Sequence, residues 1–281
     1  MLSDFLQFDF LRYTFITGIL IGIIAPILGS FLVVRRLSLL ADSLSHVTLA
    51  GIAFGLMLEK LLLFPINPLL SGMGFSVIGA ILIEKLRSVY TAYQEIGIPI
   101  ILSGGVGLSV IFIAIANGFN TDLFNYLFGS VSAVSRNDLV TIFGITVIVI
   151  VLIAFFYKEL LTLSFDEEHA IVSGIHANRI HFLFIILTAL VIAASIRIVG
   201  VLLVSALMTL PVASAMRIAV SFKQLLFLSI LFAEVSVITG LISGYFLSIP
   251  PGGTIVMIAI VILVFSILAK RLSLRLQKGA D

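Results

Sequence analysis

The sequence predicts an all-α polytopic integral membrane protein with eight or nine transmembrane helices. Of its 281 residues, 61% are hydrophobic and only 11% are charged, and its mean hydropathy is +1.30. A soluble globular chain is about half apolar and about a quarter charged. A helix that crosses the hydrocarbon core needs about 20 consecutive, mostly apolar residues, so the number of such stretches gives the number of spans.

Nine stretches approach this length. The sixth is short, and it is expected either to join the seventh or to enter the membrane as a half-helix, which leaves eight spans possible. No connection is long enough for a separate soluble domain, so residues 1–281 are expected to form a single transmembrane domain. The stretches are residues 13–34, 37–58, 61–83, 96–116, 139–157, 180–196, 199–216, 225–247 and 254–269.

The basic residues predict the orientation, because cytoplasmic loops carry an excess of Lys and Arg. If Arg35 and Arg36 face the cytoplasm, counting nine spans places twelve of the sixteen basic residues on that side. The nine-span count therefore predicts an outer N-terminus and a cytoplasmic C-terminus. With eight spans one end would change sides.

Several classes of function lack their motifs. Cysteine is absent, which excludes disulfides and thiolate metal sites and leaves nitrogen and oxygen as metal ligands. The chain contains no Gly-x-x-x-x-Gly-Lys-Ser/Thr, no His-Glu-x-x-His and no Gly-x-Ser-x-Gly, so ATP binding by a Walker motif and intramembrane hydrolysis are not expected. No basic block suggests nucleic acid. Active transport would draw energy from a partner or an ion gradient.

Asp42 and His46 form the most informative pair. Residues at i and i+4 share one helix face, and an ionisable group at membrane depth is by default a functional candidate. Counted from Arg36, His46 lies about 15 Å deep, near the middle of a ~30 Å core. Two side chains alone do not hold a divalent ion, whereas a two-fold dimer would offer two Asp and two His, a set that suits zinc and accepts manganese or iron. The alternative is an interhelical hydrogen bond that only fixes packing.

Glycines recur at four-residue spacing in three of the predicted spans. In lipid such pairs allow helices to approach closely. Ordinary packing within one chain is the favoured interpretation, and a dimer face is the alternative. The pairs are Gly18 with Gly22, Gly51 with Gly55, and Gly240 with Gly244.

The longest polar stretch, residues 157–180, predicts a short helix on the cytoplasmic face. Ser164 and Glu167 have the spacing of a capping box, acidic residues follow at the expected N-terminus, and Gly174 is a plausible stop. Such a helix is suited to contact another protein. The alternative is a solvated connector.

Four motifs together resemble the bacterial metal-ion ABC transporter permeases, the membrane subunits for zinc, manganese or iron(II) import. Residues 34–51 (VRRLSLLADSLSHVTLAG) are similar to the family signature, although Ala41 stands where the family usually has Gly. Residues 123–130 resemble its extracytoplasmic Leu-Phe-Gly-Ser element, residues 164–174 its coupling helix, and residues 200–211 its Gly-Val-x-Leu-Val-x-Ala-Leu-x-x-x-Pro run.

The resemblance implies a multi-pass permease of the bacterial cell membrane that acts as a homodimer in the lipid bilayer. Its expected partners are two cytoplasmic ATP-binding subunits, which would hydrolyse ATP in its place, and an extracytoplasmic metal-binding lipoprotein. Asp42 and His46 would line the metal path or its gate, and no permanently bound cofactor is implied. The expected ATPase-coupling residues, within 158–180, are Phe165, Asp166, Glu167, Glu168, Ala170 and Gly174.

Residues 93–100 and 118–122 look most like the zinc branch of the family in Gram-positive bacteria, so Zn²⁺ is the predicted cargo. Manganese or iron(II) transport by the same family is the alternative. A rival from another class is an ion-gradient-driven secondary carrier that uses Asp42 as a proton site. A third possibility is a structural subunit in which Asp42 and His46 only pack.

Overall fold

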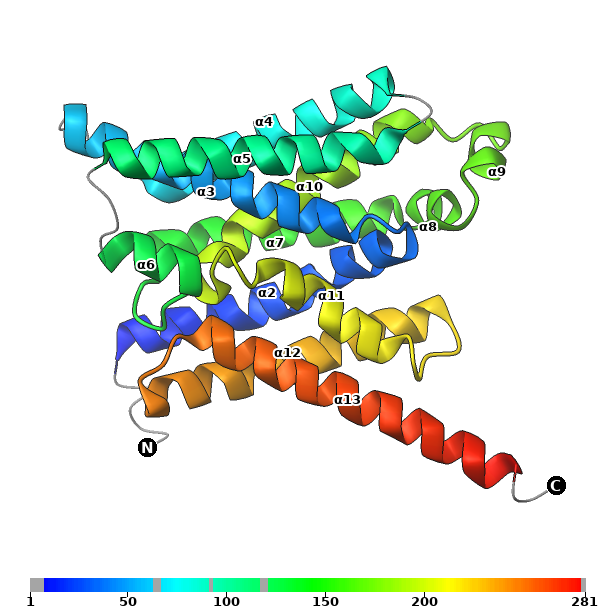
Figure 1. Ribbon diagram of the computed structural model, residues 1–281. Helices are drawn as coiled ribbons and strands as arrows, with labels where there is room; N and C mark the ends of the chain where they lie inside the picture. The colour runs from blue at the N-terminus through cyan, green and yellow to red at the C-terminus, as the bar shows by residue number, and fades with distance from the viewer. Residues whose placement is uncertain (1–7, 63–66, 91–92, 117–120, 279–281) are drawn as a thin grey trace.

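The computed structural model describes residues 8–62, 67–90, 93–116 and 121–278. Within these residues all regular secondary structure is helical, and Figure 1 shows the helices lying side by side along one common direction. Eight of them are long and apolar enough to cross a membrane. These are α2 (Asp9–Val34), α3 (Ser38–Leu62), α4 (Pro68–Val89), α5 (Gly97–Ile115), α7 (Arg136–Phe155), α10 (Ala177–Val199), α12 (Phe222–Leu247) and α13 (Pro251–Lys278).

The remaining helices are short and lie between the long ones. They are the 3₁₀ turn η1 (Gln94–Ile96), α6 (Thr121–Phe128), α8 (Tyr157–Phe165), α9 (Glu167–Val172) and α11 (Val204–Ala215). In Figure 1, α8 and α9 lie at the right-hand end of the molecule and α6 at the left-hand end. Helices α6, α8 and α9 therefore mark the two ends of the bundle, whereas α11 starts in its middle.

One expectation about the spans is wrong. The stretch 180–196, predicted to be short, belongs to α10, which is a full-length helix of 23 residues. The stretch 199–216 is the interrupted one: the chain turns at Gly200, and α11 has only 12 residues, with Pro211 inside it. The described residues therefore form eight long helices and one half-length helix, which confirms the expected eight or nine spans.

The path of the chain agrees with an odd number of crossings. Followed by colour in Figure 1, α2 begins at the left end, α11 runs from the middle of the bundle toward the right, and α13 ends at the right. The α2–α3 corner with Arg35 and Arg36 lies at the right end, together with α8 and α9. By the positive-inside rule this right-hand end is the cytoplasmic one.

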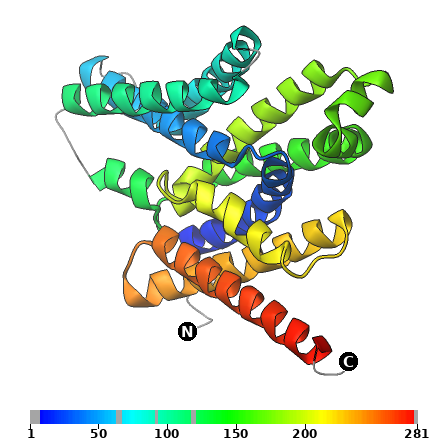
Figure 2. The same ribbon diagram turned by 45° about the vertical axis from the view of Figure 1, so that its right-hand side comes forward.

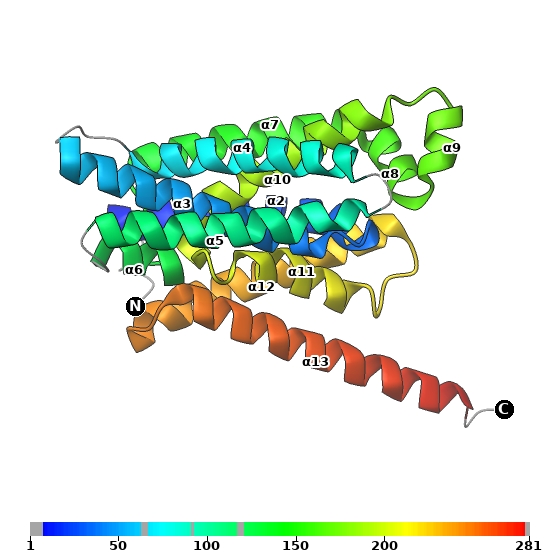
Figure 3. The same ribbon diagram turned by 45° about the horizontal axis from the view of Figure 1, so that its top comes forward.

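Three helices form the interior of the bundle. They are α2, α3 and α10, in which 67%, 72% and 72% of the most apolar window is buried, against 22% in α5 and α13. Ser43 Oγ donates to the carbonyl of Ile98 at 3.1 Å, which ties α3 to α5, and Ser76 Oγ donates to the carbonyl of Ala189 at 3.0 Å, which ties α4 to α10. Figure 3 shows α5 and α13 on the outside, where they are free to face lipid or another copy.

The glycine pairs serve contacts within the chain, as favoured. A Cβ on Gly18 or Gly22 would meet side chains of α12, one on Gly51 or Gly55 would meet α4, and one on Gly240 or Gly244 would meet the start of α13. Small residues at helix contacts allow the backbones to approach closely. These six glycines thus set helix–helix distances inside one copy.

Candidate functional site

A tight corner sets where α3 begins. Arg36 adopts the left-handed conformation with φ of 59°, and the amide of Leu37 donates to the carbonyl of Leu32 at 2.8 Å, which closes the end of α2. This is the hydrogen-bond pattern of a Schellman-type stop. Because α3 restarts at Ser38, Asp42 and His46 lie in its second and third turns, on the cytoplasmic half of the helix.

Asp42 and His46 are the two open positions on an otherwise buried stretch. Within residues 40–53, every residue except these two is buried, and both are partly exposed. Their i, i+4 spacing places them on the same stripe of α3. The rest of this stretch packs inside the copy, so the pair faces the one side of the stretch that this copy leaves uncovered.

The polar surroundings of the pair come from α11. Ser205 Oγ lies 3.5 Å from Asp42 Oδ1, at the long limit of a hydrogen bond. Ser205, Ala206 and Thr209 are all partly exposed, so α11 presents small and polar side chains beside the pair. Among the described residues the His46 ring has no hydrogen-bond or ion-pair partner. An interhelical hydrogen bond that only fixes packing would therefore depend on one 3.5 Å contact at Asp42 and on no contact at His46.

A single copy does not complete a metal site. In the described part of the chain, no group of three or more His, Cys, Asp or Glu side chains lies close enough to hold a metal ion. Asp42 and His46 supply only one carboxylate and one imidazole per copy. That a second copy completes the ligand set stays a prediction.

The interruption before α11 is held at the outer end of the bundle by three glycines. Gly129 and Gly200 have positive φ values of 79° and 86°. The amide of Val201 donates to the carbonyl of Tyr126 at 2.9 Å, so the segment after α10 bonds to α6 in place of its own helix. A Cβ on Gly129, Gly200 or Gly252 would overlap the carbonyl oxygen of Ile198, Leu127 or Val199, respectively. The close approach of these backbones is therefore what ends α10 and allows α11 to start at mid-depth.

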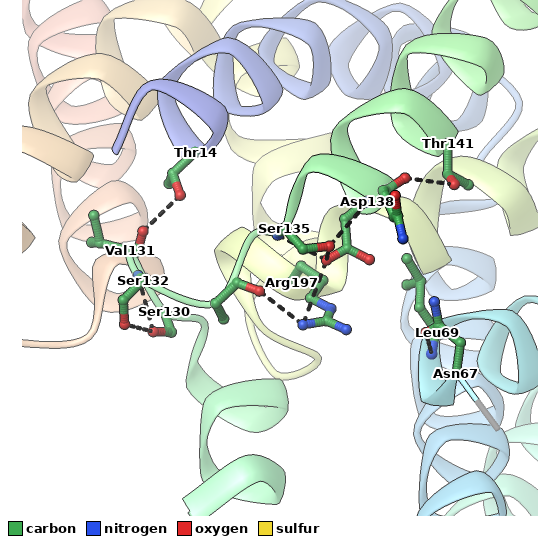
Figure 4. Close-up of polar contacts among 12 residues, drawn as sticks. Thr14, Asn67, Leu69, Ser130, Val131, Ser132, Ser135, Asp138, Thr141 and Arg197 are labelled. Atoms are coloured by element: carbon green, nitrogen blue, oxygen red, sulfur yellow. Dashed lines mark hydrogen bonds and ion pairs between the residues drawn. The ribbon is translucent and has the colours of Figure 1, made fainter. Parts of the chain in front are cut away.

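A buried ion pair fixes the loop that leads into α7. Arg197 Nη1 lies 3.6 Å from Asp138 Oδ2 and donates to the carbonyl of Ala133 at 2.8 Å (Figure 4). Asp138 is only 2% exposed and forms a capping box with Ser135. The guanidinium also lies 5.0 Å from the centre of the Tyr126 ring. Arg197 thus joins α10, α6 and α7, a role that the sequence did not reveal.

Replacing Arg197 with Met is expected to lower the free energy of unfolding by about 2 kcal/mol, because Asp138 would keep a buried charge without its cationic partner. Thermal unfolding in detergent should show an apparent Tm lower by roughly 4–8 °C. Arg136→Met removes an exposed cation from α7, the helix that carries Asp138. This variant is the matched control and should change the apparent Tm little. If Arg197→Met in an Asp138→Asn background costs as much as in the native chain, the ion pair contributes nothing.

The segment expected to couple to the ATPase folds as two short helices rather than one. Asp166 ends α8 and caps α9, since its Oδ1 accepts from the amide of His169 at 2.8 Å. The predicted capping box at Ser164 is wrong, because Ser164 Oγ donates instead to the carbonyl of Leu160 one turn earlier. Gly174 is confirmed as the stop, with φ of 83°.

The six expected coupling residues divide into anchors and exposed positions. Ala170 is fully buried against the bundle, and Asp166 and Gly174 determine where α9 begins and turns back. Phe165 is 66% exposed, and Glu167 and Glu168 are also exposed. Their neighbour Val172 is 86% exposed. The segment therefore presents apolar and acidic side chains on a firmly anchored base.

A second polar cluster at the same end was missed from the sequence. Glu84 Oε2 of α4 lies 3.2 Å from His181 Nε2 of α10 and 3.5 Å from Arg87 Nη1. The i, i+3 spacing of Glu84 and Arg87 was the available signal. The contact to His181 joins residues almost a hundred positions apart, so only the fold brings it about.

Comparison with known proteins places these features in context. The model of the family described as "ABC 3 transport family" matches residues 7–270. The chain is 32% identical to the manganese import system permease protein ScaB of Streptococcus gordonii, covering 95% of each chain. It is also 32% identical to the high-affinity zinc uptake system membrane protein ZnuB of Haemophilus influenzae, covering 93% of this chain and 98% of that one.

Among solved structures, the fold is similar to a chain of "PsaBC from Streptococcus pneumoniae in complex with Fab", with a TM-score of 0.81, 32% identity and 95% coverage of each chain. The identities to the manganese and zinc relatives are equal. Of the two segments that suggested the zinc branch, the second is only partly described, because residues 118–120 lie outside the described residues.

Proposed function

This chain belongs to the ABC 3 transport family and is a multi-pass bacterial membrane permease of a metal-ion importer, and we propose that zinc is the ion it carries and that Asp42 and His46 line its path. Permeases of such importers are not themselves enzymes, because ATP hydrolysis takes place in a separate subunit. The observation that carries the proposal is the position of the pair: two metal-ligating side chains are open on an otherwise buried stretch of α3.

The surroundings of the pair suit a transient metal site. Asp42 supplies a carboxylate that lowers the electrostatic barrier to a divalent cation, and a neutral His46 supplies a nitrogen ligand. A second copy placed across the open face would double this set to two of each. Conduction requires release as well as binding, and a half-length helix such as α11 beside the pair offers an element that moves without breaking a full span.

The cytoplasmic end offers a place for an ATP-binding partner. We infer that the exposed side chains of α8 and α9 dock on that partner, while buried Ala170 transmits its movement to the bundle. Phe165 packs against Phe222 of α12 with ring centres 5.9 Å apart, and Phe222 in turn lies 5.0 Å from Phe31 of α2. A shift of α8 would thus reach α2 and, through the corner at Arg36, the start of α3. Switching between outward- and inward-facing states follows as a two-state change biased by nucleotide.

The choice of zinc over manganese rests on the likeness of residues 93–100 and 118–122 to the zinc branch. Manganese is the second candidate, favoured by relatives whose names state manganese import. Both ions accept mixed histidine and carboxylate ligands. The remaining partners that we propose are a second copy of the chain and an extracytoplasmic metal-binding lipoprotein.

Uptake of zinc and manganese by cells in chelated medium tests the function directly. Cells that lack this chain, with its partner subunits present, are expected to lose most of their high-affinity zinc uptake and to regain it when the chain is restored. Manganese should then compete weakly. Restoration of manganese uptake alone would replace zinc by manganese within the same family. Transport without the ATP-binding partner, abolished by an uncoupler, would favour the gradient-driven carrier.

A further inference from the structure

A pocket of about 640 Å³ lies between the cytoplasmic ends of α4 and α10. Figure 2 shows the backbones of these two helices diverging toward that end. The pocket lies away from Asp42 and His46 and is lined by none of the residues assigned to the metal path. Its polar side chains come from α4, the start of α10 and the turn η1. They include Lys85, Arg87, Gln94, Asn178 and Arg179.

The charges that line the pocket are unequally matched. Glu84 is held by Arg87 and His181, whose atoms lie 3.5 Å and 3.2 Å away. Glu167 of α9 is the other carboxylate in the lining. Lys85 and Arg179 are both exposed, and within the described residues neither side chain forms a hydrogen bond or an ion pair. Two free cations therefore face one free carboxylate.

A buried guanidinium group adds to this positive excess. The Nη1 atom of Arg35 is buried without a hydrogen-bond partner in the described structure, whereas Arg87 is engaged by Glu84 and by Gln94 Oε1 at 3.0 Å. Burial, and next the charge of Arg87, lower the pKa of Arg35 to about 10. Buried donors nearly always have an acceptor, so this guanidinium nitrogen and the unbalanced charge of Lys85 and Arg179 point to an anion.

The outer wall of the pocket is apolar and belongs to the membrane-spanning helices. Ile81 and Phe182 line it and are 42% and 38% exposed. They lie about one turn or less from Lys85 and Arg179, respectively. The pocket thus has a basic mouth at the cytoplasmic surface and an apolar flank on the membrane side. A soluble anion would use the mouth alone, whereas a phospholipid would use both parts.

We propose that this pocket binds the headgroup of an anionic phospholipid from the cytoplasmic leaflet. The phosphodiester oxygens accept hydrogen bonds from Lys85 and Arg179, and the acyl chains lie along Ile81 and Phe182. Basic pockets between transmembrane helices on this side of a membrane bind anionic headgroups in this way. Because Glu167 of α9 lines the same pocket, the bound lipid lies beside the coupling segment. The proposal does not depend on which metal is carried.

Native mass spectrometry of the full chain in detergent, titrated with phosphatidylglycerol or phosphatidylcholine, tests the site. We expect one phosphatidylglycerol per chain to be retained well after phosphatidylcholine has dissociated. The double variant Lys85→Gln/Arg179→Gln should bind phosphatidylglycerol roughly 10- to 30-fold more weakly, since each basic residue near a headgroup contributes about one factor of five. Both side chains are exposed, so the fold should be unaffected.

Two further variants sharpen the test. Arg217→Gln/Lys223→Gln removes the same charge from exposed positions at the same end of the bundle, and it should leave the affinity within about twofold. Glu167→Gln removes the opposing carboxylate and should tighten binding several-fold. An equal loss in both double variants would show general surface attraction and overturn the site.

Two further experiments distinguish a lipid headgroup from a soluble phosphate compound. Soluble glycerophosphoglycerol should fail to displace the lipid at millimolar concentration, and displacement would indicate a free-phosphate site instead. Addition of the ATP-binding subunit should leave the lipid in place. If that subunit expels the lipid stoichiometrically, the pocket belongs to the protein interface and the lipid assignment is wrong.

Discussion

Replacing Asp42 with Ala is expected to reduce metal uptake by about 100-fold or more at equal membrane expression. Loss of a residue that merely supports a metal ligand costs 10- to 100-fold in affinity or activity, so loss of the carboxylate itself should cost at least as much. Within the described residues this carboxylate has one long contact, to Ser205 at 3.5 Å. Its removal should therefore change the apparent Tm by no more than a few degrees, which separates a transport role from a packing role.

The measurement compares the initial rates of zinc and manganese uptake for the native chain, Asp42→Ala, Asp42→Asn and His46→Ala. Asp42→Asn keeps the shape of the side chain and removes the charge, so it should be nearly as defective as Asp42→Ala. His176→Ala replaces an exposed histidine that lies outside α8 and α9, just before α10, and is the matched control for His46→Ala. Normal uptake by Asp42→Asn together with His46→Ala would remove the pair from the path and return it to packing.

Among Gly→Ala substitutions at the outer end of the bundle, Gly252→Ala is expected to destabilise the fold most. Gly252 is buried in the first turn of α13, and its added Cβ would overlap the carbonyl oxygen of Val199. Backbone cannot rotate away as a side chain can, so the overpacking should cost about 3 kcal/mol or more. An apparent Tm lower by roughly 10 °C, with loss of uptake, is the expected result.

Gly253→Ala provides the matched control one residue along. A Cβ at Gly253 would meet nothing within 4 Å, and Ala favours a helix over Gly by up to about 1 kcal/mol. Gly253→Ala should therefore be neutral or slightly stabilising. The two variants differ only in which side of α13 receives the methyl group. Equal stability of Gly252→Ala and Gly253→Ala would contradict the close contact between α13 and the end of α10.

Much of the architecture follows from local chemistry. Long apolar runs between polar turns are sufficient to place six of the eight long helices within four residues at each end, whereas α4 begins seven residues later than expected and α13 ends nine residues later. The same local logic put Asp42 and His46 on one face of α3 and predicted Gly174 as a helix stop, because helical periodicity and the conformational freedom of Gly act over a few residues. Ser164 shows the limit of this logic. Asp166 is an equally good cap two positions later, and only the folded chain selects it.

The amino-acid sequence by itself determined that this chain is a membrane-embedded helical bundle, which end of it is basic, and that Asp42 and His46 share one face of α3. Tertiary structure alone decided that α10 is continuous while the next span is cut to half its length. Hydropathy measures how apolar a stretch is, but a helix continues only if each amide bonds within its own turn. At Val201 the amide bonds instead to Tyr126 of α6. For the same reason the pairing of Glu84 with His181, and of Asp138 with Arg197, depends on backbones that meet only after folding.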